Sequence, residues 1–262
     1  MSNTLKRILI SIVAIPLMLY AAYAGGYPFF AFCLLVQTLS LYELLKMFEN
    51  KGFTVSVYYS LFVSVVVFAG FVFFREYFNA ILASGLISVL VLELLRKKEN
   101  KLLNAGLVFF GLIYITFPFA LFFKLDKNYT YVYLLFLLIW ANDSFAFFGG
   151  KYFGKHKFSK ISPNKTIEGL VVGFVFTIIT SVIFHYLVSG ITMTDSLVVG
   201  VFVGVFGPLG DLFESFLKRY TNVKDSSNII PGHGGLLDRF DSLILCAPFA
   251  YIYFNYIKDV IK

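Results

Sequence analysis

Three carboxylates near the C-terminal end of the chain have the spacing of a divalent-cation site. Asp238 and Asp241 stand three residues apart, so on a helix they share one face, and Asp211 lies upstream in an otherwise apolar run. Mg²⁺ usually takes one or two carboxylates and completes its shell with water and substrate phosphate. The sequence therefore predicts that these carboxylates hold a hard divalent cation, with Mg²⁺ as the expected ion and a second cation left open.

Residues 215–241 surround these carboxylates with mixed charge and glycine in a chain that is otherwise very apolar. Charge of this density is costly near hydrocarbon, so the stretch is a candidate functional site. Gly234 and Gly235 allow the backbone to approach a ligand closely. His233 lies between glycines and among charges, and the sequence leaves open whether it contacts phosphate, handles a proton or is structural.

A second polar stretch, residues 162–169, has the features of a phosphate-binding helix start. Ser162 before Pro163 predicts a helix N-terminus, where free N–H groups and the helix dipole attract anions. Lys165 and Thr166 add a cation and a hydroxyl, and a basic loop precedes them. A plain capping motif is the alternative, but the adjoining lysines favour phosphate binding.

Asn142 and Asp143 form a third polar position, inside an apolar run. A carboxylate there is expected to face the bundle interior or a water-filled cavity rather than lipid. Asp143 is therefore predicted to contact a metal or a substrate, with a structural hydrogen bond to a neighbouring helix as the alternative for this position.

Membrane-spanning helices must position these groups. The chain of 262 residues is 59% hydrophobic and only 14% charged, whereas a soluble domain carries roughly 25% charged residues. Apolar runs near the roughly 20 residues that cross a bilayer recur from end to end. The predicted fold class is an all-α polytopic membrane protein with about nine transmembrane helices. Their expected ranges are 8–24, 27–48, 56–74, 77–95, 104–123, 129–148, 167–189, 195–217 and 240–257.

The distribution of Lys and Arg predicts the orientation of these helices. With a cytoplasmic N-terminus, 17 of the 22 basic residues fall in cytoplasmic segments and five on the other side, in agreement with the positive-inside rule. The C-terminus is then outside, and the polar loops 149–166 and 218–239 both face the cytoplasm. We therefore expect an inner-membrane protein with its site on the cytoplasmic side. The net charge of +7 reflects topology and anionic phosphates, so no nucleic-acid partner is expected.

The polar chemistry is confined to one part of the chain. Residues 1–128 are predicted to be a scaffold of transmembrane helices, and residues 129–262 the catalytic region. Glu43 and Glu93 are the charged exceptions within the scaffold. Each has a basic residue three positions on, so we expect two interfacial ion pairs, Glu43 with Lys46 and Glu93 with Arg96.

Together, the polar stretches resemble the phosphatidate cytidylyltransferases, also called CDP-diacylglycerol synthases. The resemblance is carried by Ser215-x-Leu217-Lys218-Arg219-x4-Lys224-Asp225-x-Ser227-x2-Ile230-Pro231-x-His233-Gly234-Gly235-Leu236-x-Asp238-Arg239-Phe240-Asp241, without a departure across its 27 residues. Residues 162–169 and Asn142-Asp143 resemble two further conserved stretches of that family. The specific resemblance covers residues 140–241, whereas the N-terminal half is similar only in being hydrophobic and multi-spanning.

The resemblance implies transfer of a cytidylyl group from CTP to phosphatidic acid, giving CDP-diacylglycerol and pyrophosphate, with Mg²⁺ required. It also implies a membrane-embedded homodimer whose polar funnel opens to the cytoplasm and to membrane lipid. The expected metal ligands are Asp211 and Asp238 first, then Asp143, with Asp241 as an alternative. The expected catalytic residues are Asp211, Asp238, Lys218 and Arg239. The expected substrate-binding residues are Ser162, Asn164, Lys165, Thr166, Ser215, Arg219, Lys224, Asp225, His233, Gly234 and Gly235.

Two alternatives stay open. A related CTP-dependent enzyme would act on another lipid phosphate or a polyprenol, because the motifs do not fix the lipid tail. An ion-coupled membrane transporter is the alternative from a different class, since embedded carboxylates and glycine-rich helices also mark transport paths. The clustering of the charges at one membrane face opposes the transporter, as does the lack of paired broken helices in two halves of the sequence.

Overall fold

The computed structural model describes residues 3–229 and 234–260, with side chains of the first helix described from Ser11 onward. Within these ranges every regular element is helical, and an isolated bridge joins Lys157 to Thr166. The predicted all-α fold is therefore confirmed. The chain divides into two compact units, the first comprising Met1–Lys124 and Tyr220–Arg239 and the second Leu125–Arg219 and Phe240–Lys262.

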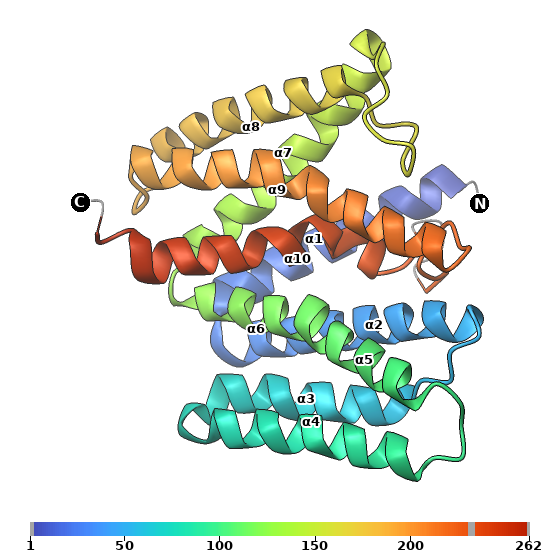
Figure 1. Ribbon diagram of the computed structural model, residues 1–262. Coiled ribbons are helices and arrows are strands. Elements are labelled where there is room, and N and C mark those ends of the chain that lie inside the picture. The colour runs from blue at the N-terminus through green and yellow to red at the C-terminus, as the bar shows by residue number, and fades with distance from the viewer. Residues whose placement is uncertain (1–2, 230–233, 261–262) are drawn as a thin grey trace. The chain divides into compact units, whose positions relative to one another are not determined.

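Helix α2 is the central helix of the first unit, because it contacts α1, α3, α5 and α6. The helices of this unit are α1 (Asn3–Ala24), α2 (Gly26–Asn50), α3 (Val57–Phe73), α4 (Phe78–Leu95), α5 (Lys101–Gly111) and α6 (Phe117–Phe123) (Figure 1). Phe29, Leu41 and Leu44 of α2 are buried. A π-helical turn, Leu112–Thr116, joins α5 to α6 just before Pro118, which lacks the N–H of a regular helical bond.

The second unit is built from long helices that approach one another through small residues. The long helices beyond α6 are α7 (Tyr129–Phe153), α8 (Ile167–Leu187), α9 (Met193–Tyr220) and α10 (Leu237–Ile252). A Cβ on Gly173 of α8 would lie 2.9 Å from the Cβ of Ala146 on α7, and one on Gly204 of α9 would lie 2.6 Å from the ring of Phe174 on α8. Such close contact through small residues is how helices gain packing energy in a membrane.

The described ranges contain nine helical segments, in the positions of the nine predicted spans. By length and composition seven of them can cross a membrane, and Ser11–Ala24 and Val57–Phe73 are shorter apolar helices. The chain is an integral membrane protein. Two helices extend into the predicted polar loops: α7 continues through Gly149 and Gly150 to Phe153, and α9 continues to Tyr220. The predicted loops 149–166 and 218–239 therefore both begin with helix.

The start of α8 agrees with the expected span 167–189, whereas the helix N-terminus predicted at Ser162 and Pro163 is wrong. The helix begins at Ile167, and the Thr166 hydroxyl caps it by accepting a hydrogen bond from the Gly169 N–H at 3.1 Å. Ser162 instead opens a turn, closed by the Lys165 N–H donating to the Ser162 carbonyl at 3.1 Å. Proline suits the second position of a turn as well as the first position of a helix, and both threonine and serine can cap a helix. The sequence was therefore compatible with a helix that starts at Pro163 and with a turn followed by a helix that Thr166 caps.

A buried ion pair links the first turn of α9 to the C-terminal end of the second unit. Asp195 is 2% exposed, pairs with Nζ of Lys258 at 2.9 Å, and accepts a hydrogen bond from the Tyr253 hydroxyl at 2.9 Å. Lys258 also donates to the Tyr131 hydroxyl at 3.0 Å. Burial lowers the pKa of the Lys258 ammonium, but its bonds to Tyr131 and Asp195 outweigh burial and hold that pKa above its usual value. The ion pair therefore stays charged at neutral pH.

Replacing Lys258 with Met is expected to destabilise the protein by about 3 kcal/mol, because Asp195 would remain as a buried charge without its cation. The measurement is the Tm of the purified protein in detergent at pH 7. Lys127→Met is the control, because Lys127 is an exposed lysine on the same unit. Equal Tm values for the two variants would show that the ion pair does not stabilise the fold.

Candidate active site

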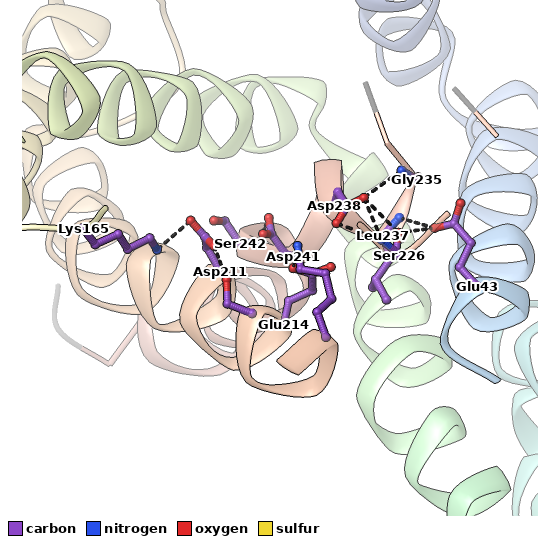
Figure 2. A network of polar contacts seen from close by, with 12 residues as sticks. Glu43, Lys165, Asp211, Glu214, Ser226, Gly235, Leu237, Asp238, Asp241 and Ser242 are labelled. Carbon is purple, nitrogen blue, oxygen red and sulfur yellow. Dashed lines mark hydrogen bonds and ion pairs between the residues drawn. The ribbon is translucent and has the colours of Figure 1, made fainter. Parts of the chain in front are cut away.

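Three carboxylates of the second unit lie close enough together to share a cation. One oxygen from each of Asp211, Glu214 and Asp241 lies within 4.8 Å of the others, and Figure 2 shows the three side chains gathered at this point. Glu214 is completely buried, and Asp241 is 8% exposed. Three acids at this spacing fit a hard divalent cation, whose preferred ligands are carboxylate oxygens.

Two helices bring this acidic group together. Asp211 and Glu214 share a face of α9, since they are three residues apart, and α10 supplies Asp241. Gly210 lets α10 approach, because a Cβ at that position would lie 2.6 Å from the carbonyl oxygen of Asp241. The Ser242 hydroxyl donates to the Gly207 carbonyl at 3.0 Å and adds a polar link between the two helices.

Lysines accompany two of the three acids. Nζ of Lys165 lies 2.6 Å from Oδ2 of Asp211 and donates to the Pro208 carbonyl at 3.3 Å (Figure 2). Lys218 forms an ion pair with Glu214, one helical turn away on α9. Alternating acids and lysines at one place give a site that can bind both cations and phosphates.

The hydroxyl of Ser215 donates to Oδ1 of Asp211 at 3.3 Å. This bond orients an acid of the group, and the substrate-binding role expected for Ser215 stays a prediction. Asp241 lies within electrostatic range of Asp211, Asp143 and Lys218.

Asn142 and Asp143 differ in their contacts, and the structural interpretation of this position applies to Asn142. Nδ2 of the buried Asn142 donates to the Thr177 hydroxyl of α8 at 3.0 Å, which is the structural hydrogen bond to a neighbouring helix. Asp143 is exposed on α7, and the acidic group as the described residues define it does not include Asp143. A role for Asp143 as a metal ligand stays a prediction.

Asp238 makes a different set of contacts, with residues of the first unit. Its carboxylate accepts hydrogen bonds from the Gly235 N–H at 2.7 Å and the Ser226 N–H at 3.1 Å, and it lies 3.0 Å from the Ser226 hydroxyl. In the described residues the acidic group consists of Asp211, Glu214 and Asp241. The metal-ligand role expected for Asp238 stays a prediction, and the observed role of its carboxylate is to hold the loop before α10.

The other predicted substrate-binding residues are distributed over both units. Thr166 caps α8, and Lys165 pairs with Asp211. Gly234 has φ of +83° and lies against the carboxylate of Asp238. His233 lies outside the described residues. The exposed members of the predicted set are Asn164, Arg219, Lys224, Asp225 and Arg239.

The sequence analysis left Glu214 out of the metal ligands and gave Glu43 the wrong partner. Glu214 follows Asp211 by three residues, so helical spacing was the signal that could have added it to the metal ligands. The expected pair of Glu43 with Lys46 is wrong, because Lys46 pairs with Glu49 at 2.6 Å. The corresponding pair of Glu93 with Arg96, at 2.6 Å, is confirmed. Glu43 instead accepts four hydrogen bonds from residues 226–237.

The fold and the site define an integral membrane protein of helices that carries a cluster of acids and lysines suited to a divalent cation and phosphates. The chain belongs to the cytidylyltransferase family, whose family model matches residues 5–257. It is 35% identical over 257 residues to the phosphatidate cytidylyltransferase of Bacillus subtilis (strain 168), covering 94% of this chain and 96% of that protein. The phosphatidate cytidylyltransferase of Staphylococcus aureus (strain COL) is 34% identical over 254 residues, covering 94% and 95%. That of Staphylococcus haemolyticus (strain JCSC1435) is 32% identical over 249 residues, covering 92% and 95%.

Proposed function

We propose that this protein transfers the cytidylyl group of CTP to phosphatidic acid, giving CDP-diacylglycerol and pyrophosphate for phospholipid biosynthesis. The observation that carries the proposal is the similarity to phosphatidate cytidylyltransferases, which extends over at least 92% of the chain. The cluster of acids and lysines supports it, because both substrates are polyanions.

This reaction requires that the two substrates are positioned and that the negative charge of their phosphates is compensated. A phosphate oxygen of phosphatidic acid attacks the α-phosphorus of CTP, a new P–O bond forms, and the bond from that phosphorus to the bridging oxygen of pyrophosphate breaks. The attacking oxygen is already anionic at neutral pH, so no strong general base is required. The barrier comes from repulsion between two polyanions and from charge on the departing pyrophosphate, which fixed positive charge can offset.

Asp211, Glu214 and Asp241 would hold a divalent cation, and we propose Mg²⁺. The donor set fits this ion: three carboxylates within 4.8 Å, of which Glu214 is fully buried. When bound, such a cation supplies positive charge that stabilises the phosphate oxygens. The protein's own part is to hold these carboxylates in place, which Ser215 supports at Asp211 by donating a hydrogen bond to it.

Lys165 and Lys218 are the lysines placed to contact substrate phosphates. Each now pairs with an acid of the group, Asp211 and Glu214 respectively. A divalent cation on those acids would compete with the lysines, which could then turn to phosphate. Arg219, Lys224 and Arg239 are exposed and add positive charge for CTP or the lipid headgroup.

We further propose that the site faces the cytoplasm and that the chain forms a homodimer. The orientation rests on the 17 to 5 distribution of Lys and Arg and on the need to reach a water-soluble nucleotide. The homodimer rests on the family resemblance. A site at the depth of the membrane interface would let CTP enter from water and phosphatidic acid from the bilayer.

Purified protein in detergent micelles with CTP, phosphatidic acid and Mg²⁺ is expected to release pyrophosphate and to form cytidylylated lipid in equal amounts. Radiolabelled CTP follows the lipid product, and a coupled assay follows pyrophosphate. Turnover with a polyprenyl phosphate but not with phosphatidic acid would assign a different lipid substrate. Absence of any CTP-dependent product would contradict the proposed function.

A further inference from the structure

The most unusual buried charge of the first unit is Glu43 on α2, which lies far in sequence from every predicted site residue. Its side chain is completely buried. Oε1 accepts hydrogen bonds from the Ser227 hydroxyl at 2.6 Å and the Leu236 N–H at 3.0 Å. Oε2 accepts from the Ser226 hydroxyl at 3.0 Å and the Leu237 N–H at 2.8 Å, and Figure 2 shows Glu43 facing these groups.

The four partners of Glu43 lie at the two ends of the segment that precedes α10. Ser226 and Ser227 are at its beginning, and Leu236 and Leu237 are at its end. Asp238 joins the same two ends from the other side, because it accepts hydrogen bonds from Ser226 and from the Gly235 N–H. Two carboxylates therefore fasten the described ends of this segment together.

Gly235 is required by this arrangement. A Cβ there would collide with the hydroxyl of Ser226 and with Oε2 of Glu43. The sequence pattern suggested that this glycine shapes a pocket for substrate. In the structure its missing side chain leaves room for the carboxylate of Glu43 instead.

Burying a carboxylate is costly unless its hydrogen bonds are satisfied. Glu43 meets this requirement with uncharged donors, since its four partners among the described residues are two hydroxyls and two backbone N–H groups. A membrane scaffold gains little from such a charge where an apolar side chain would pack as well. The contacts instead hold together the two described ends of the segment, next to Lys224 at one end and Arg239 at the other.

We propose that Glu43 is a positioning residue for catalysis, which holds Ser226 and Ser227 beside Leu236 and Leu237 and thereby sets the placement of Lys224 and Arg239. The proposal rests on the proposed function, because those two residues are the ones expected to bind phosphate there. Glu43 itself touches no substrate. Loss of the Glu43 carboxylate is therefore expected to raise the KM for CTP and to loosen the two described ends of the segment.

Glu43→Gln is the sharpest variant, because it keeps the size of the side chain and removes its charge. Each carboxylate oxygen now faces one backbone N–H, of Leu236 or of Leu237. In either orientation the amide NH₂ of Gln must face one of these donors, so at least one hydrogen bond is lost. Glu93→Gln is the matched control, because Glu93 is 2% exposed in the same unit and contacts Arg96 and Ser56 rather than the segment.

The first measurement is hydrogen exchange of the Leu236 and Leu237 amides in detergent-solubilised protein without substrates. Glu43→Gln is expected to speed their exchange by about 10- to 100-fold, as for loss of one or two hydrogen bonds to a charged group. The second is steady-state kinetics, with the KM for CTP raised about tenfold or more and a smaller change in kcat. Glu93→Gln should leave both unchanged.

Unchanged exchange at Leu236 and Leu237 together with a wild-type KM for CTP in Glu43→Gln would overturn the proposal. If Glu43→Gln does not fold, Ser227→Ala removes one donor to Glu43 and should speed exchange at Leu236 in the same direction; wild-type exchange there would overturn it equally. A wild-type enzyme that makes no product from CTP and phosphatidic acid would contradict the proposed function alone, since the exchange measurement needs no turnover.

Discussion

Asp211→Asn is expected to lower kcat by about 10²- to 10³-fold while the protein still folds and inserts. Oδ2 of Asp211 lies 2.6 Å from Nζ of Lys165, and Oδ1 accepts from Ser215, so an amide of the same shape removes the negative charge from this ion pair and turns one oxygen ligand into an NH₂ group. The acidic group also falls from three charges to two. The Asp211 side chain is 35% exposed, so loss of its ion pair costs little stability. Lipid product from CTP and phosphatidic acid gives kcat, and the Tm in detergent reports folding.

Asp195→Asn is the matched control for this prediction. Asp195 lies on the same helix, α9, and is also paired with a lysine, but it belongs to the network of Lys258 and Tyr253. Asp195→Asn should lower the Tm, while the folded protein keeps the kcat of the wild type. The Mg²⁺ concentration for half-maximal rate should rise in Asp211→Asn and not in Asp195→Asn. A wild-type kcat in Asp211→Asn would remove Asp211 from the site.

The sequence also predicts that Asp238→Asn is inactive. This variant distinguishes less well between a metal ligand and a structural residue. Asp238 accepts hydrogen bonds from Gly235 and Ser226, so an amide would loosen the segment whether or not the residue binds a metal. Loss of activity there fits either role. Asp211 is therefore the better test of the metal assignment.

The helices could be predicted from the sequence because apolar runs of membrane length are a strong signal, whereas their ends could not. Gly149 and Gly150 suggested the end of a helix, yet α7 runs through them. A Cβ on Gly149 would collide with Val172 of α8, so this glycine serves helix packing rather than helix termination. Tertiary packing of this kind overrides the low helix propensity of glycine.

The acids of the site were predictable to the extent that they follow helical spacing. Asp211, Glu214 and Lys218 lie at intervals of three and four on α9, and the same reasoning covers all three. The partners of Glu43 were not predictable in this way. They lie 183 to 194 residues away in the sequence, while Lys46, three residues on, offered a local partner that the structure assigns to Glu49. Local spacing carries no information about which distant segment a buried acid will meet.

The ion pair of Lys165 with Asp211 allows a test that separates a structural lysine from a catalytic one. Lys165→Met is expected to lower kcat/KM for CTP by about 10²- to 10³-fold, because a positive charge placed for the phosphates is lost. The double variant Lys165→Asp with Asp211→Lys restores an ion pair with its charges exchanged. Its Tm should be close to that of the wild type but its turnover should stay low, since a phosphate-binding cation and a metal-binding acid would each stand in the wrong place.

Lys157→Met provides the matched control for Lys165. Lys157 is exposed on the same loop and bonds through its backbone bridge to Thr166, so its charge adds only to the general field of the loop. At an ionic strength near 0.15 M that field is largely screened, and kcat/KM should fall by no more than a few-fold. Recovery of turnover in the charge-exchanged double variant would mean that Lys165 serves only to hold the start of α8 against α9. Failure of Lys165→Met to exceed the effect of Lys157→Met would mean the same.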